Sequence, residues 1–151
     1  MNSAQSERYS RQIKLPQLGE SGQKRLLDAR VLIIGMGGLG SPVSMYLAAA
    51  GVGHLVISDY DRVDESNLQR QIVHTQASIN ELKATSARDT LLRLNPAISI
   101  DALGYELDDV ELSEQVIQAD AVVDCTDNFP SRFALNRVSL ATGRPVVSGA
   151  A

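Results

Sequence analysis

Short apolar runs alternate with amphipathic or polar stretches along most of the chain. The apolar runs are rich in β-branched residues and are flanked by charged residues, glycines or turn residues, which predicts buried strands. The predicted strands are 31–34, 55–59, 98–103, 121–125 and 145–148. Helices are predicted between them at 43–50, 83–94, 110–118 and 131–142. This alternation predicts an α/β fold, a doubly wound and mostly parallel sheet with helices on both faces.

Two short predicted helices, 6–13 and 22–28, carry many charged and amide groups and precede the sheet. We therefore divide the chain into an N-terminal helical segment, 1–30, and an α/β domain, 31–151. The 151 residues are 44% hydrophobic but only 4% aromatic, with no Trp. A core of this size must then be built from Val, Ile, Leu and Ala, as in a parallel sheet covered by helices.

Charge, hydropathy and cysteine usage exclude several classes of partner. The net charge of −4 offers no global field for nucleic acid or an anionic membrane. No apolar run approaches the roughly 20 residues of a membrane span, and the polar start lacks a signal-peptide pattern. The single cysteine, Cys125, excludes an internal disulfide framework and suits a reducing compartment. We expect a cytoplasmic protein that binds neither nucleic acid nor membranes.

The first predicted strand leads into a glycine-rich turn with glycines at four positions: Gly35, Gly37, Gly38 and Gly40. Glycines allow the chain to turn tightly and let backbone amides approach a phosphate, and a following helix adds positive potential. We predict Ser41 as the N-cap of that helix, with Pro42 at its first position. Asp59 lies where a carboxylate accepts hydrogen bonds from ribose hydroxyls. This Rossmann-like pattern predicts a bound nucleotide and suits ATP and NAD equally.

The segments that follow resemble the signature of the E1-like adenylating enzymes, the ThiF, MoeB and HesA family. Its longest parts are Gly51-Val52-Gly53, Asp59-Tyr60-Asp61-Arg62-Val63 and Ser66-Asn67-Leu68-Gln69-Arg70-Gln71. Three further blocks resemble the same family: Arg8-Tyr9-Ser10-Arg11-Gln12, Lys83 and Cys125-Thr126-Asp127-Asn128. The resemblance covers essentially the whole chain.

The resemblance implies a role for each matching side chain. Arg70 and Lys83 are expected to contact the phosphates of ATP, and Arg11 to reach into the site of a neighbouring subunit of a homodimer. Such cations neutralise the charge that builds up on transferring phosphoryl groups. Asp127 is expected to hold Mg²⁺. Asn67 would add a polar contact to the nucleotide, and Asp61 ranks below Asp59 and Asp127 as a nucleotide-binding residue.

The activity that the resemblance implies is ATP-dependent adenylylation of the C-terminal carboxylate of a ubiquitin-like sulfur-carrier protein. The carrier would be of the ThiS or MoaD type, for thiamine thiazole or molybdopterin synthesis, with a slight preference for thiamine. The attacking carboxylate, with a pKa of about 3.5, is already ionised at neutral pH, so no general base is required.

Two other functions stay open. An NAD-dependent oxidoreductase would share the glycine turn and Asp59, but would have no use for Asn67, Arg70, Lys83 and Asp127 at these spacings. A non-catalytic nucleotide-binding module is the second, because the resemblance implies that the domain continues beyond Ala151. The expected continuation holds further strands and two Cys-x-x-Cys pairs for structural Zn²⁺, so we expect a domain truncated at its C-terminal end.

Several polar residues are predicted to lie outside the chemistry. Asp124 and Cys125, at the end of an apolar strand, are interpreted as structural. His54 and His74 lack partners at metal-ligand spacing and are interpreted as non-catalytic. For Arg132, the sequence leaves open whether it joins the phosphate-binding cations or pairs with a carboxylate.

Overall fold

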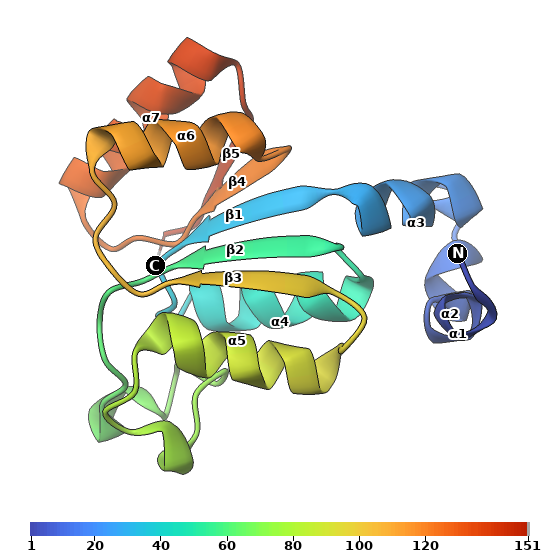
Figure 1. The fold of residues 1–151 in the computed structure, drawn as a ribbon, viewed down its shortest axis with the longest axis horizontal. Helices are drawn as coiled ribbons and strands as arrows, with labels where there is room; N and C mark the ends of the chain where they lie inside the picture. The colour runs from blue at the N-terminus through green and yellow to red at the C-terminus, as the bar shows by residue number, and fades with distance from the viewer. Residues whose placement is uncertain (151) are drawn as a thin grey trace.

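The fold is built on one parallel sheet, which a computed structural model describes within residues 1–150. Its strands are β1 (Arg30–Ile34), β2 (His54–Ser58), β3 (Ser99–Leu103), β4 (Ala121–Asp124) and β5 (Val146–Ser148). They pair in the order β3-β2-β1-β4-β5, and every pair is parallel (Figure 1). The predicted fold class is therefore confirmed. The chain builds outward from β1 in one direction and then crosses back to continue on its other side.

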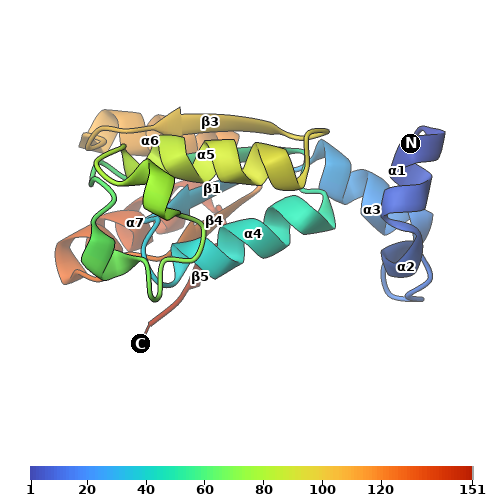
Figure 2. The ribbon, with the colours of Figure 1, turned by 90° about the horizontal axis from the view of Figure 1, so that it is seen from below.

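Helices cover both faces of the sheet, with a separate apolar core on each face (Figures 1 and 2). On one face lie α4 (Gly40–Ala50) and α5 (Lys83–Leu94), and on the other α6 (Asp109–Gln118) and α7 (Phe129–Thr142). Side chains alternate along each strand, so Ile33 packs toward α4 and α5 while Leu32 packs toward α6 and α7. This two-sided burial explains why the strands are continuous apolar runs.

The connection between β2 and α5 is long and folds back on itself at the carboxyl edge of the sheet (Figure 1). It contains two 3₁₀ helices, η1 (Glu65–Asn67) and η2 (Gln76–Ser78). Its ends are joined, because Arg62 forms an isolated antiparallel bridge with Leu82 and the Val63 amide donates to Glu81 O over 2.9 Å. The connection therefore returns to the sheet edge and places Lys83 at the start of α5.

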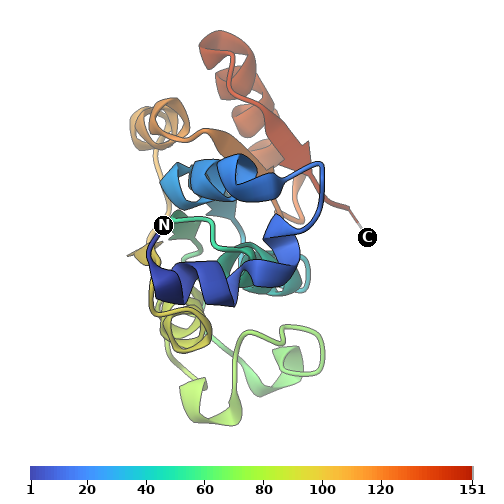
Figure 3. The same ribbon diagram turned by 90° about the vertical axis from the view of Figure 1, so that its right-hand side faces the viewer.

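Three helices precede the sheet and lie at its amino end: α1 (Ser3–Arg8), α2 (Ser10–Ile13) and α3 (Gly19–Asp28) (Figures 1 and 3). The buried Tyr9 fixes them to the body, since its hydroxyl accepts a 2.9 Å hydrogen bond from Asn95 Nδ2. Gln12 Nε2 donates to Ala50 O over 2.8 Å. A Cβ at Gly51 would come within 2.5 Å of the Tyr9 ring, so this close approach requires glycine.

Four predicted helix starts were wrong. The helix predicted at 22–28 begins earlier, at Gly19, as α3. The predicted helix 6–13 is two helices divided at Tyr9, and the first begins at Ser3 because Asn2 and Gln5 form a capping box. Ser41 is not an N-cap: α4 begins at Gly40, and Ser41 lies fully buried in the first turn. Helix α7 begins at Phe129 because Asn128 caps it, accepting from the Ser131 amide over 2.9 Å. Within residues 1–150, none of the helices has the length and apolar character needed to cross a membrane.

Candidate nucleotide-binding site

Most of the predicted site residues follow three adjacent strands at the carboxyl edge of the sheet. The register aligns Ile34, the last residue of β1, with Ser58 of β2 and Asp124 of β4. The glycine turn, Asp59 and Asp127 therefore leave the sheet at the same level. The edge between β1 and β4 is where the strand order reverses, the position at which open α/β sheets bind ligands.

The glycine turn is tightly constrained by its surroundings. Gly35 has φ +93°, and a Cβ there would lie 2.8 Å from Cys125 O. A Cβ at Gly40 would lie 2.9 Å from Gly35 C and closer still to its carbonyl oxygen. Among residues 1–150, no hydrogen-bond acceptor takes the amides of Gly37, Gly38 and Leu39. Three backbone donors at the start of α4 are thus available to an anion.

Asp59 is held beneath this turn. Its Oδ2 accepts a 2.7 Å hydrogen bond from the Met36 amide, and its Oδ1 accepts one of 2.8 Å from the Asp61 amide. Burial raises the pKa of Asp59 above its ordinary value, and the two amide donors partly offset this effect. The carboxylate therefore links the glycine turn to the β2–α5 connection, and its remaining lone pairs can accept from hydroxyl groups.

Arg70 and Asn67 lie on the connection beside the glycine turn. The Cγ and Cδ atoms of Arg70 lie 3.7 Å from the position that a Cβ of Gly38 would take. Its exposed guanidinium donates to Ser66 O over 3.2 Å. Asn67 is half-buried and accepts from the Arg70 amide over 3.1 Å through its backbone carbonyl. The structure thus places the side-chain stem of Arg70 beside Gly38 of the turn.

Lys83 is buried at the start of α5, with its ammonium paired to a carboxylate. Lys83 Nζ lies 3.0 Å from Asp61 Oδ2, and the Lys83 amide donates to Asp61 O over 2.8 Å. Only 8% of the Lys83 side chain is exposed, so the pair offsets the cost of burying its charge. Because Asp61 already partners the lysine, the position of Lys83 at a helix start does not by itself require a phosphate.

Asp127 is exposed in the loop between β4 and α7. Asp124 shapes this loop: its Oδ1 accepts from the Thr126 amide over 3.0 Å and its Oδ2 from Ser148 Oγ over 2.7 Å. The prediction that Asp124 is structural is confirmed. Within residues 1–150, no three His, Cys, Asp or Glu side chains cluster so as to hold a metal ion. Asp127 therefore belongs to no such cluster of three.

Two arginines lie outside this group. Arg132 Nη2 donates to Thr126 O over 2.8 Å and to Gly149 O over 2.6 Å, so it joins the loops after β4 and β5. Its guanidinium thus bonds backbone carbonyls rather than a carboxylate. Arg11 is exposed on α2 at the amino end of the sheet, opposite the glycine turn (Figure 1). The structure does not bring Arg11 to the site within one chain.

One buried residue beneath the turn was not predicted to belong to it. His74 Nε2 lies 3.1 Å from Met36 O, and His74 Nδ1 lies 2.9 Å from Ser86 Oγ. His54, interpreted in the same way from the sequence, lies instead at the amino end of β2, 2.8 Å from Asp101. The only sequence signal for a role of His74 in the site was its position shortly after the Asn67–Arg70 segment.

Burial raises the pKa of Cys125 to about 11, so its thiol is unsuited to nucleophilic work.

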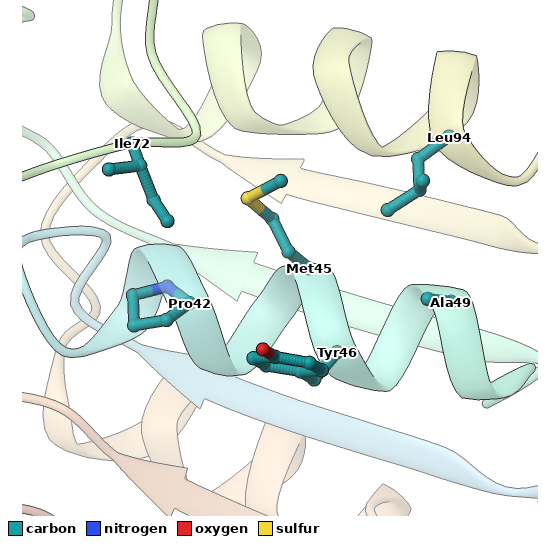
Figure 4. A pocket seen from close by; sticks show the side chains of 6 residues that line it. All are labelled: Pro42, Met45, Tyr46, Ala49, Ile72 and Leu94. Carbon is teal, nitrogen blue, oxygen red and sulfur yellow. The ribbon is translucent and has the colours of Figure 1, made fainter.

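An apolar pocket of about 260 Å³ lies between α4, the β2–α5 connection and the end of α5. Figure 4 shows its lining: Pro42, Met45, Tyr46, Ala49, Ile72 and Leu94. None of these side chains carries a charge. The pocket offers no groups for phosphate, so the polar edge of the sheet is the better nucleotide site.

The chain has a glycine turn with free amides, a helix that begins at this turn and an acidic residue after the second strand. Together these features define an α/β domain of the Rossmann-like class. The sequence matches the ThiF family over residues 9–151, and the chain belongs to this family.

Relatives with assigned activities share this sequence closely. A molybdopterin-synthase adenylyltransferase of Escherichia coli K12 is 50% identical over 144 residues, covering 95% of this chain and 58% of that protein. A sulfur carrier protein ThiS adenylyltransferase of the same strain is 46% identical over 151 residues, covering 100% of this chain and 60% of that protein. The chain thus spans somewhat over half the length of these relatives.

A solved structure also has this fold. The crystal structure of E. coli MccB with ATP matches with a TM-score of 0.84 and 27% identity, covering 99% of this chain and 46% of that one.

Proposed function

We propose that the chain binds Mg²⁺-ATP at the carboxyl edge of its sheet and forms part of an enzyme that adenylylates the C-terminal carboxylate of a ubiquitin-like sulfur-carrier protein. The observation that carries the proposal is the glycine turn, where three free amides lie beside Arg70. Donors of this kind, supplemented by a cation, suit a polyphosphate. The two adenylyltransferases that share 50% and 46% identity with the chain support this ligand and this substrate class.

Each site residue then has a physical task. The amides of Gly37, Gly38 and Leu39 bind phosphate oxygens, and Arg70 and Lys83 neutralise the charge that builds up when a carboxylate attacks the α-phosphorus. Asp59 accepts from the ribose hydroxyls and Asn67 adds a polar contact, while Asp61 pairs with the Lys83 ammonium over 3.0 Å and holds it at the start of α5. The attacking carboxylate is already ionised, so the residues bind and orient rather than move a proton.

Asp127 fits Mg²⁺ in the way that nucleotide enzymes commonly hold it. Mg²⁺ usually takes one or two carboxylates, with substrate phosphates and waters completing its shell, so an exposed single carboxylate is sufficient. When bound, the ion neutralises phosphate charge. Structural Zn²⁺ does not fit residues 1–150, which contain a single, buried cysteine.

Arg11 would act on a second subunit. It is exposed at the end of the fold opposite the glycine turn, so it can serve a nucleotide only if two chains associate (Figure 1). We therefore propose a homodimer in which Arg11 of one chain completes the site of the other. We place this assembly in the cytoplasm, in keeping with the single thiol of the sequence.

The carrier is of the ThiS or the MoaD type. Both kinds of activating enzyme are similar to this chain, at 46% and 50% identity, and the slight preference for thiamine gains no support from these figures. A non-catalytic nucleotide-binding module remains the second candidate, because the glycine turn and Asp59 could bind a nucleotide without any catalytic step.

Calorimetric titration tests the ligand. Mg²⁺-ATP is expected to bind, NAD is not, and the reverse result would favour an oxidoreductase. Arg70→Ala should weaken ATP binding, while Arg93→Ala, an exposed arginine at the far end of α5, should not.

Carrier-dependent exchange of labelled pyrophosphate into ATP tests the chemistry. Asp127→Ala and Arg70→Ala are expected to abolish it. Exchange that persists unchanged in both variants would disprove the site, and binding without exchange in the unmodified chain would favour the non-catalytic module.

A further inference from the structure

We propose that His74 is a positioning residue of the nucleotide site, which holds the peptide group between Met36 and Gly37 so that the Gly37 amide faces the phosphates. The inference rests on the proposed ATP site. His74 is 5% exposed, and neither the family resemblance nor the proposed chemistry gives it a task.

The contacts of the ring define its tautomer. Its Nε2 lies 3.1 Å from Met36 O, and a carbonyl oxygen can only accept, so Nε2 carries a proton and donates. Nδ1 lies 2.9 Å from Ser86 Oγ and accepts from that hydroxyl when the ring is neutral. Burial lowers the pKa of His74, and the positive charge of Lys83 acts in the same direction, so the ring is neutral at physiological pH.

Because the peptide group is rigid, the hydrogen bond from His74 to the Met36 carbonyl also fixes the direction of the Gly37 amide. A trans peptide is planar, and its C=O and N–H point in opposite directions. No peptide bond is cis in the part of the chain that the structure describes. The Met36 carbonyl points inward to His74, so the amide of Gly37 points away from the protein interior. Like the amides of Gly38 and Leu39, that amide bonds to no acceptor among residues 1–150.

Glycine makes such a lock necessary. Rotation of the peptide group requires changes in ψ of Met36 and φ of Gly37, and glycine accepts positive and negative φ about equally. The absence of a side chain at Gly37 gives a phosphate room to approach, but it also allows the peptide group to rotate. Asp59 already holds the Met36 amide over 2.7 Å, and the Met36 side chain is fully buried. His74 fixes the one remaining polar group of Met36, its carbonyl.

A pair of substitutions separates the two ring nitrogens. His74→Gln places an amide nitrogen near the position of Nε2 and can still donate to Met36 O, whereas His74→Asn reaches only the position of Nδ1. Ser86→Ala removes the hydroxyl that orients the ring. His54→Asn is the matched control, because His54 lies at the opposite end of the sheet. Mg²⁺-ATP affinity is measured by calorimetry, with the unfolding midpoint and the hydrogen exchange of the Gly37 amide measured on the same samples.

We expect His74→Asn to weaken ATP binding about fivefold to tenfold, the value of one buried hydrogen bond, and to change the exchange rate of the Gly37 amide. His74→Gln should stay within about twofold, Ser86→Ala should lose about threefold, and His54→Asn should match the unmodified chain.

Equal ATP affinities for the unmodified chain and both His74 variants would overturn the inference while leaving the proposed function intact. Equal losses in the Asn and Gln variants would overturn it too, since they would indicate a merely structural ring. If the Asn variant does not fold, an unchanged affinity in Ser86→Ala overturns it instead. An unmodified chain that does not bind ATP would refute the proposed function, and the inference with it.

Discussion

The glycines of the turn divide into those that the fold requires and those that the ligand requires, and alanine substitutions at two of them test this. At Gly40, the new methyl would lie 2.9 Å from Gly35 C and closer to its oxygen. Both atoms belong to the backbone, so they cannot move away from the methyl as a flexible side chain could. At Gly38, the nearest atoms are Cγ and Cδ of Arg70 at 3.7 Å, an ordinary contact with a flexible side chain.

The cost at Gly40 follows from these contacts. Overpacking costs about 1–3 kcal/mol, and the better helix propensity of alanine returns less than about 1 kcal/mol at the first position of α4. A net loss of about 1–2 kcal/mol lowers the melting temperature of a protein of this size by about 2–8 °C. Gly38→Ala should melt within about 2 °C of the unmodified chain, as surface substitutions do.

Thermal denaturation and ATP titration of the two variants together check the argument. Gly38→Ala should fold normally but bind ATP about tenfold more weakly, because its methyl crowds the phosphate that the amides would bind. A Gly40→Ala protein that melts with the unmodified chain would refute the idea that the close approach of the turn to α4 requires a glycine.

Three further predictions concern buried polar groups. Since burial lowers the pKa of His74 from its ordinary 6.5, the unfolded chain takes up this proton first as pH falls. The stability that the neutral ring contributes is therefore fully present above pH 6.5 and declines below it. Urea unfolding should give a lower free energy of unfolding at about pH 5.5 than at about pH 7.5. His74→Gln should reduce this difference. The Cys125 thiol, with a pKa of about 11, should resist alkylation by iodoacetamide at about pH 8 in the folded protein and react in urea. Mass spectrometry measures both alkylation rates. Equal rates in the folded and unfolded protein would contradict the burial of the thiol. Lys83→Met keeps the apolar stem and removes a buried charge, so the free energy of unfolding should change by less than about 1 kcal/mol. ATP affinity, measured by calorimetry, should fall about tenfold or more. An unchanged affinity would remove Lys83 from the site.

The sequence predicted the elements well because their signals are local. The strands are apolar runs buried on both faces, and the turn glycines and Asp59 have a fixed spacing along the chain. The errors fell on helix starts. The caps at Asn2 and Asn128 are local signals that the prediction missed, whereas at α4 the tertiary structure overrode a capping preference. Ser41 has good N-cap chemistry, but the chain enters α4 directly from the glycine turn and buries its side chain.

What the sequence by itself determined about this protein is its strands and helices, the glycine turn and the acidic residue after the second strand. Each of these depends on residues close together in the chain. Only the tertiary structure decided the partners of the buried polar groups. Met36 O and His74 are 38 residues apart, and Tyr9 and Asn95 are 86 apart. Such hydrogen bonds depend on which loops converge at a sheet edge, and no local pattern of residues encodes that convergence.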